Sequence, residues 1–262
     1  MDWIKSRIGA LRGRKAERTV ASVPEGEVVY AVGDVHGRAD LLRDLLARIE
    51  ADWAASPSQT MRLLMLGDYV DRGAESKGVL DILVDLVAQG GDRMVAMKGN
   101  HEEALLGFLQ DPTTGAAWAE HGGRETLVSY GVNPPRGRGD DDAWREARDA
   151  FARVIPPAHL DFLRNLQLFA TVGDYIFVHA GLRPGLPLDQ QEEHDLLWIR
   201  KEFLDAPAWN TQVVVHGHTP LAEPVIRPGR IGVDTGAYAT GVLTAVRLEG
   251  DRRSFLRTGV QD

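Results

Sequence analysis

Side chains that can bind divalent metal ions recur in five short polar clusters along this chain. Their donor groups are carboxylates, an amide and imidazoles, a mixture that suits manganese, iron or zinc. The residues are Asp34, His36, Asp68, Asn100, His179 and His218. Because a carboxylate has two oxygens, Asp68 could bridge two ions. The predicted ligands are Asp34, His36 and Asp68 for one ion, and Asp68, Asn100, His179 and His218 for the other.

The number of histidines indicates which cofactor to expect. A magnesium site would contain fewer imidazoles, and the absence of cysteine excludes a zinc–thiolate site. We therefore expect two divalent ions, with manganese first and iron or zinc as alternatives. Two such ions held close together activate water for attack on phosphorus. The predicted chemistry is hydrolysis of a phosphoester.

Each cluster directly follows an apolar run with the length and composition of a buried strand. The runs are 28–32, 63–66, 94–97, 175–178 and 213–215. In open α/β sheets, ligands bind beyond the carboxyl ends of the strands, so polar residues that follow five strands can meet at one place. If the chain stays extended after the first run, Asp34 and His36 point the same way. Leucines at helical spacing in 39–51 and 78–88 predict βαβ units.

The pattern predicts one large domain over residues 27–262, which is within the usual range for an α/β domain. A basic N-terminal extension at 1–26 precedes it and has the apolar spacing of a solvated or loosely docked helix. Residues 111–165 are predicted to form a helical insert, interrupted by prolines and glycines. We expect this insert and the loop around Tyr238 to shape the substrate groove.

The composition of the whole chain excludes several classes of protein. A formal net charge of −8 argues against a nucleic-acid-binding surface. Without cysteine, disulfide bonds and the chemistry of cysteine-dependent phosphatases are excluded. No apolar run approaches the roughly 18 residues needed to cross a bilayer, and the N-terminus lacks the apolar core of a signal peptide. We therefore expect a cytoplasmic protein without stable membrane insertion.

The clusters also resemble the motifs of a known family. Gly-Asp-x-His-Gly, Gly-Asp-x-Val-Asp-Arg-Gly, Gly-Asn-His-Glu, His-Ala-Gly and a final Gly-His occur in family order between about Val28 and Leu248. They are similar to the motifs of the metal-dependent phosphoprotein phosphatases, the group that contains calcineurin and bacteriophage lambda phosphatase. The resemblance implies an α/β protein with the calcineurin-like metallophosphoesterase fold, a β-sandwich of two mixed sheets flanked by helices.

The same resemblance implies roles for further residues. His101 would be the general acid toward the leaving group, and Asp71 would orient its imidazole. Arg72 would grip the phosphate oxygens through its planar guanidinium, with Asn100 also in contact with phosphate. Arg200 resembles a second phosphate-binding arginine of the bacterial and phage members. An arginine at the start of a helix is also an ordinary surface charge, so this role has a plain structural alternative.

The resemblance favours a bacterial-type serine/threonine protein phosphatase that acts on a phosphoprotein or a small phosphoester. The alternative is a symmetrical dinucleoside-tetraphosphate hydrolase, which shares the fold and the metals. Asp71 and Glu102 favour the phosphatase, because those hydrolases usually depart from Val-Asp-Arg-Gly and end the third motif in Asp. Pro220 stands where many members of the wider superfamily have a second histidine, which phosphoprotein phosphatases also lack. An inactive binding scaffold is disfavoured, since no matched position is missing.

The other histidines do not share the position at a strand end. His121, His159 and His194 lie in predicted helices or loops, and we interpret them as structural or solvent-exposed. His216 directly precedes the Gly217-His218 pair. Its position is compatible with a supporting role behind the metal ligands or with a purely structural one.

Overall fold

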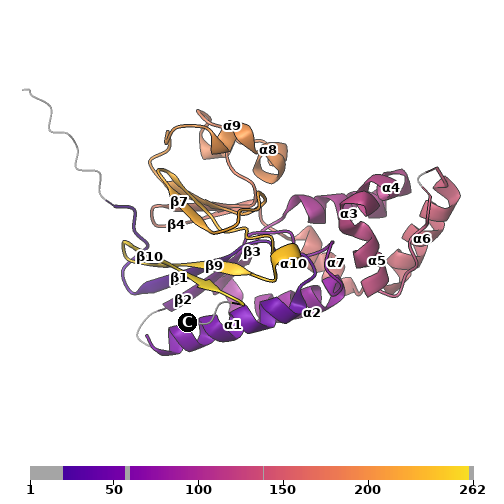
Figure 1. Ribbon diagram of the computed structural model, residues 1–262, viewed down its shortest axis with the longest axis horizontal. Coiled ribbons are helices and arrows are strands. Elements are labelled where there is room, and N and C mark those ends of the chain that lie inside the picture. The colour runs from indigo at the N-terminus through magenta and orange to yellow at the C-terminus, as the bar shows by residue number, and fades with distance from the viewer. Residues whose placement is uncertain (1–19, 57–59, 138, 260–262) are drawn as a thin grey trace, which may run out of the picture.

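Two five-stranded sheets pack face to face in the computed structural model of the protein (Figure 1). The structure describes residues 20–56, 60–137 and 139–259. The strand order is β10-β9-β1-β2-β3 in the first sheet and β4-β5-β6-β8-β7 in the second. Both sheets contain parallel and antiparallel neighbours. The predicted β-sandwich of two mixed sheets is confirmed.

The first sheet joins strands from both ends of the chain. Three strands run parallel, β1 beside β2 and β2 beside β3, and β9 and β10 add antiparallel partners next to β1. In this register Val28 lies opposite Met61, and Leu63 lies opposite Met94. The strands are β1 (Glu27–Val32), β2 (Thr60–Met65), β3 (Met94–Ala96), β9 (Thr244–Glu249) and β10 (Arg252–Arg257).

The second sheet holds β5, β6 and β8 as parallel neighbours, with antiparallel β4 and β7 at its edges. The strands are β4 (Phe169–Val172), β5 (Tyr175–Val178), β6 (Val213–His216), β7 (Val225–Arg227) and β8 (Arg230–Gly232). The five strands predicted to precede the polar clusters are therefore divided between the two sheets. Three of them lie in the first sheet and two in the second.

The alternation of side chains along β1 explains the layers. Val28, Tyr30 and Val32 pack into the core between the first sheet and the helices that cover its outer face. Val29 and Ala31 point the other way, into the core between the two sheets. A strand that is buried on both faces reads as a continuous apolar run, which is the pattern found in the sequence.

Helices cover the outer faces of both sheets. Figure 1 shows α1 and α2 along the first sheet and α8 and α9 over the second, where a third apolar cluster lies. The helices outside the region 112–164 are α1 (Ala39–Ala54), α2 (Ser76–Gly90), η1 (Gly91–Arg93), α3 (Asn100–Gln110), η4 (Leu188–Gln190), α8 (Glu193–Trp198), α9 (Lys201–Leu204) and α10 (Ala237–Thr240). Within the described residues, none is long and apolar enough to span a membrane.

The segment from 112 to 164 is helical and lies beside α3, at one end of the sandwich (Figure 1). Its elements are η2 (Pro112–Thr114), α4 (Gly115–Trp118), η3 (Ala119–Gly123), α5 (Arg124–Ser129), α6 (Asp141–Val154) and α7 (Pro157–Arg164). It occupies the part of the sequence where we predict an insert. Of the predicted extension 1–26, residues 1–19 lie outside the described residues, and Val23 is buried in the core between the sheets.

Candidate metal centre and active site

Backbone hydrogen bonds join the loops that follow four of the five predicted strands in two pairs. The N–H of His36, after β1, donates to the carbonyl of Asp68, after β2, at 2.8 Å. The N–H of Gly217, after β6, donates to the carbonyl of His179, after β5, at 2.8 Å. Carboxyl ends of parallel neighbours share one end of a sheet, so polar loops from both sheets come together there.

Five residues other than glycine have a positive φ angle in the described part of the chain, and all five are predicted site residues. They are His36 (45°), Asp68 (52°), Asp71 (72°), Arg72 (68°) and His218 (62°). Such backbone costs roughly 1–3 kcal/mol per residue and concentrates at functional sites. β1 ends at Val32 and His36 has a left-handed backbone, so the extended chain that would align Asp34 with His36 is not present there. A left-handed turn directs the ring of His36 instead.

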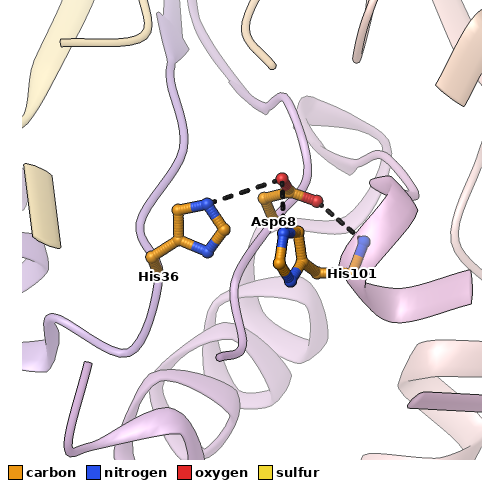
Figure 2. Close-up of side chains that lie close together, drawn as sticks. All are labelled: His36, Asp68 and His101. Atoms are coloured by element: carbon orange, nitrogen blue, oxygen red, sulfur yellow. Dashed lines mark hydrogen bonds and ion pairs between the residues drawn. The ribbon is translucent and has the colours of Figure 1, made fainter. Parts of the chain in front are cut away.

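His36, Asp68 and His101 form a first group of side chains that could hold a metal ion (Figure 2). Asp68 Oδ2 lies 3.6 Å from His36 Nε2 and 3.9 Å from His101 Nε2. The backbone N–H of His101 donates to Asp68 Oδ1 at 3.0 Å. All three residues are buried. The geometry thus places His101, predicted as a proton donor, within reach of the same ion as His36.

A second group shares Asp68 with the first. His179 Nε2 lies 3.4 Å from Asp68 Oδ1, 2.9 Å from Asn100 Oδ1 and 3.2 Å from His218 Nδ1. Asn100 Oδ1 is also 2.8 Å from His218 Nδ1. The structure therefore brings together four of the predicted ligands of the second ion, around a carboxylate that also belongs to the first group.

Hydrogen bonds to backbone carbonyls fix which ring nitrogen points into the site. His36 Nδ1 donates to the carbonyl of Val70, and His179 Nδ1 donates to that of Leu66, both at 2.9 Å. Each Nε2 is then left with its lone pair, as in metal-binding histidines. Burial lowers the pKa of His36 well below its usual range, that of His179 to about 3 and that of His218 to about 2. The imidazoles are therefore neutral.

The buried carboxylates need a positive partner. Burial raises the pKa of Asp34 and Asp68 well above the usual range, and Asp234 adds repulsion at Asp34 while Glu102 adds it at Asp68. Both oxygens of Asp34 accept from the N–H of His218 at 3.1 Å, and Asp34 belongs to neither group of mutually close ligand atoms. Carboxylates gathered with neutral imidazole lone pairs repel one another unless a cation lies among them, so this donor set fits divalent metal ions.

Glu102 holds the loop that carries Asp68. Its carboxylate accepts from the backbone N–H groups of Asp68 and Tyr69 at 2.8 Å, of Gly99 at 2.9 Å and of Val70 at 3.3 Å. Burial nevertheless raises its pKa to about 7. Gly99 must lack a side chain, because a Cβ there would lie 2.1 Å from Asp68 Oδ1. Glu102 therefore positions a loop whose strained backbone it cross-links.

Asp71 and His101 form a buried pair. His101 Nδ1 lies 2.7 Å from Asp71 Oδ2, which also accepts from Trp118 Nε1 at 2.8 Å, and the hydroxyl of Thr126 donates to Asp71 Oδ1 at 2.6 Å. Burial raises the pKa of Asp71 to about 7, and burial together with nearby cations such as Arg72 lowers that of His101 to about 3. The pair thus holds one proton between Asp71 Oδ2 and His101 Nδ1.

Two arginines lie near this pair. Arg72 Nη2 is 3.2 Å from His101 Nε2, and its guanidinium lies over the ring of Tyr238, 4.7 Å from the ring centre. Arg200 approaches the hydroxyl of Thr219 at 3.4 Å, and its charge also lowers the pKa of His101. The structure therefore places both predicted phosphate-binding arginines where their charges reach the histidines of the site.

The structure also places two of the remaining histidines. His159 is buried between the hydroxyl of Tyr130, at 2.7 Å, and Asp81, at 3.0 Å, which confirms a structural interpretation. His216 is buried behind the site, with Nδ1 3.1 Å from the carbonyl of Gly217. It joins neither group of possible ligands.

Comparison with known proteins decides the family. The calcineurin-like phosphoesterase model matches residues 28–245, which is most of the chain and includes every residue of the site described above. The chain belongs to the calcineurin-like phosphoesterase family. Members of this metallophosphoesterase family use a dinuclear divalent metal site, in agreement with the two Asp68-sharing groups. This calcineurin-like phosphoesterase is therefore a hydrolase.

Its relatives include proteins named bis(5'-nucleosyl)-tetraphosphatases. The asymmetrical bis(5'-nucleosyl)-tetraphosphatase PrpE of Anoxybacillus flavithermus is 26% identical over 237 residues, covering 82% of this chain and 88% of that one. A symmetrical bis(5'-nucleosyl)-tetraphosphatase of Dechloromonas aromatica is 32% identical over 157 residues, covering 59% of this chain and 44% of that one. This phosphoesterase is thus related to named tetraphosphatases along most of its length.

Solved structures confirm the fold. A candidate diadenosine tetraphosphatase superposes with a TM-score of 0.62 at 21% identity and covers 91% of this chain and 98% of that one. A serine/threonine phosphatase of Saccharomyces cerevisiae with similarity to human PP5 gives a TM-score of 0.55 at 15% identity, covering 94% and 86%. At these identities the similarity to both structures shows the fold alone.

Three residues at the site of this phosphoesterase escape sequence reasoning. Asp234, buried beside Asp34, directly follows the apolar strand end Ile231–Val233, which is the same signal that marks the predicted ligands. Trp118 and Thr126 lie in the helical segment and reach Asp71 from 47 and 55 residues away. No local pattern announces contacts over that separation.

Proposed function

We propose that this calcineurin-like phosphoesterase hydrolyses dinucleoside tetraphosphates in a metal-dependent reaction. One observation carries the reaction class: two groups of buried ligand atoms share Asp68, and Arg72 lies beside them. The substrate class rests on relatives such as PrpE, which match 82% of the chain and are named tetraphosphatases. The motifs alone favour a protein phosphatase, so this proposal reverses that preference. The bond to be cleaved is then a phosphoanhydride and not a phosphate monoester.

The proposed ligands are those predicted from the sequence. His36 and Asp68 would hold one ion, joined by Asp34, whose carboxylate lies outside the two groups of mutually close atoms but near enough to Asp68 to raise its own pKa. Asp68, Asn100, His179 and His218 would hold the other ion. Manganese is our first proposal because carboxylate, amide and imidazole donors suit it, and iron or zinc would fit the same donors. Two bound ions would neutralise charge on the phosphate and lower the pKa of a nearby water.

The chain's own residues would bind the phosphate and handle the proton. Arg72 and Arg200 supply fixed positive charge, and a guanidinium can bind two phosphate oxygens at once. A water oxygen bonds to phosphorus as the bond from phosphorus to the leaving oxygen breaks. The proton of His101 lies on Nδ1 toward Asp71, so its Nε2 would first take up the proton that the attacking water loses and would then give it to the leaving oxygen. A phosphate leaving group needs this proton less than a serine alkoxide does.

A specific observation favours a second candidate, the protein phosphatase. Asp71 is fully buried, and besides its bond with His101 it accepts from Trp118 and Thr126, which hold it in place. Such a costly arrangement serves a reaction in which proton transfer to a poor leaving group limits the rate. Hydrolysis of a phosphoserine or phosphothreonine side chain is a reaction of this kind.

Turnover on two substrates distinguishes the candidates. The purified protein, loaded with Mn²⁺, should hydrolyse diadenosine tetraphosphate with a higher kcat/KM than a phosphoserine peptide. Chromatography of the products identifies the bond that is cleaved, since symmetrical cleavage gives two ADP and asymmetrical cleavage gives ATP and AMP. Dominant turnover of the peptide would overturn the proposal in favour of the second candidate.

A further inference from the structure

A pocket of about 430 Å³ adjoins the metal centre on the side of His101. That volume is within the range of small-molecule sites. Its walls come from α3, from the helical segment and from the end of α8. The walls include Gly107, Trp118, Trp198 and Arg200, and Arg72 and His101 border the pocket toward Asp68. The pocket is therefore continuous with the site but is not used by any step above.

Aromatic and small side chains give this pocket apolar surfaces. Trp198 is 38% exposed, and its indole is fixed by a hydrogen bond from Nε1 to Glu103 at 2.6 Å and by the ring of His194 stacked against it. Trp118 is held in turn by its bond to Asp71. Both indole N–H groups are thus occupied within the protein. Trp118 is buried in the core, whereas the exposed and fixed indole of Trp198 can stack with a planar ligand at little entropic cost.

The charge of the pocket is positive. Arg72 and Arg200 line it, and among its lining residues in the described part of the chain none is acidic. A ligand that matches this surface combines a planar aromatic group with several negative charges. Nucleoside polyphosphates have both features, whereas an aromatic side chain of a peptide has only the first.

We infer that this pocket binds the nucleoside of the leaving portion of a nucleoside polyphosphate, with the base against Trp198. The inference rests on the proposed function, since it names how that substrate is selected. His101 lies between the pocket and Asp68, so the group in the pocket is on the side where the proton would be given. Arg72 and Arg200 would then contact the phosphates that connect the base to the reacting phosphorus.

Gly107 offers a way to test the pocket without disturbing the core. It lines the pocket, and a Cβ placed on it would meet no heavy atom within 4 Å. A leucine there would extend into the space claimed for the base, and replacing a helical glycine favours the helix. Gln110→Leu adds the same side chain to an exposed position of α3 that does not line the pocket, and so serves as the matched control.

The experiment measures binding of ADP and of inorganic pyrophosphate by calorimetry on the Mn²⁺-loaded protein. The wild type should bind ADP more tightly than pyrophosphate. Because stacking of a base on an aromatic ring is worth about 1–3 kcal/mol, Trp198→Ala should weaken ADP roughly 5- to 150-fold. Gly107→Leu should do the same, Trp198→Phe should recover part of the loss, and none should change pyrophosphate binding. Gln110→Leu should bind both ligands like the wild type.

Each outcome separates this inference from the proposed function. Equal affinity of the wild type for ADP and pyrophosphate, or unchanged ADP binding in Gly107→Leu, would overturn the nucleoside subsite even if diadenosine tetraphosphate is hydrolysed. A third titration uses a phosphoserine peptide, and loss of peptide binding alone in Gly107→Leu would also overturn the inference and assign the pocket to a peptide. Selective loss of ADP binding without turnover of the dinucleotide would support the subsite while removing the proposed function.

Discussion

Replacing Asp71 with Asn should remove catalysis while leaving the fold intact. The amide oxygen can accept from His101 Nδ1 and Trp118 Nε1 as the carboxylate does. Its NH₂ group can donate to the hydroxyl of Thr126, which can turn toward Ser76 Oγ at 3.0 Å. Only the negative charge is lost. Since burial raises the pKa of Asp71 to about 7, an ionised carboxyl is costly there, and we expect Tm at pH 8 not to fall.

The size of the catalytic loss follows from the lost charge. Asp71 lies against His101, and two unit charges about 4 Å apart attract by about 4 kcal/mol at an effective dielectric constant of 20. If the imidazolium of His101 is only partly formed in the transition state, the charge of Asp71 stabilises it by only part of this energy. We therefore expect kcat to fall about 10²- to 10³-fold, since each factor of ten corresponds to about 1.4 kcal/mol.

Steady-state kinetics on a phosphoserine peptide and on diadenosine tetraphosphate would measure this loss, with thermal unfolding as the stability readout. The peptide reaction should suffer more, because its leaving alkoxide needs the proton more. Asp81→Asn is the matched control: it alters a second Asp–His pair, with His159, outside the site, and should leave kcat unchanged. A kcat of Asp71→Asn within twofold of the wild type on the peptide would refute the reasoning.

Three further predictions concern the proton donor, the metals and pH. His101→Asn should lower turnover of a phosphoserine peptide about 10²- to 10⁴-fold with metal content unchanged, whereas loss of one metal per chain would make His101 a ligand. Asp68→Asn should weaken both ions, and two metals per chain by elemental analysis would contradict bridging. Burial raises the pKa of Asp34 and Asp68, so metal-free protein keeps protons there that it releases on unfolding. Above pH 7 the buried histidines no longer change the free energy of unfolding, so the Tm of the metal-free protein should fall from pH 7 to pH 8.5. Bound Mn²⁺ should abolish this fall. A Tm in EDTA that stays constant over this pH range would contradict the prediction.

The sequence predicts much of the site because its residues sit at fixed positions in short motifs. A polar cluster directly after a buried strand must lie at the strand's carboxyl end, whichever sheet contains the strand. The loops after β1 and β6 therefore meet although these strands lie in different sheets. The backbone N–H of His218 donates to the side-chain carboxylate of Asp34 and joins these loops across 184 residues.

Backbone conformation and long-range contacts escape the sequence for physical reasons. The ring of His36 is aimed by a left-handed turn, and nothing in the residue type requires a positive φ there. Trp118 and Thr126 donate the hydrogen bonds that hold Asp71. Both come from helices whose packing depends on the whole core. Asp234 carries the strand-end signal but stands outside the recognised motifs.

The choice of substrate depends on features that no motif contains. Asp71 and Glu102 match the phosphoprotein phosphatase motifs. Glu102, however, accepts hydrogen bonds from backbone N–H groups of the loop that carries Asp68. That loop is needed for the hydrolysis of either substrate, so Glu102 does not distinguish between them. The pocket beside Trp198 is assembled from α3, the helical segment and α8. Selectivity for a nucleotide or a peptide is decided there, by shape and charge that only the folded chain brings together.

Anomalous scattering from crystals grown with Mn²⁺ tests the central claim most directly, because it locates each ion and its ligands. We expect two peaks with the carboxylate of Asp68 between them, one beside His36 and the other beside His179 and His218. A single peak, or two peaks without Asp68 between them, would contradict it.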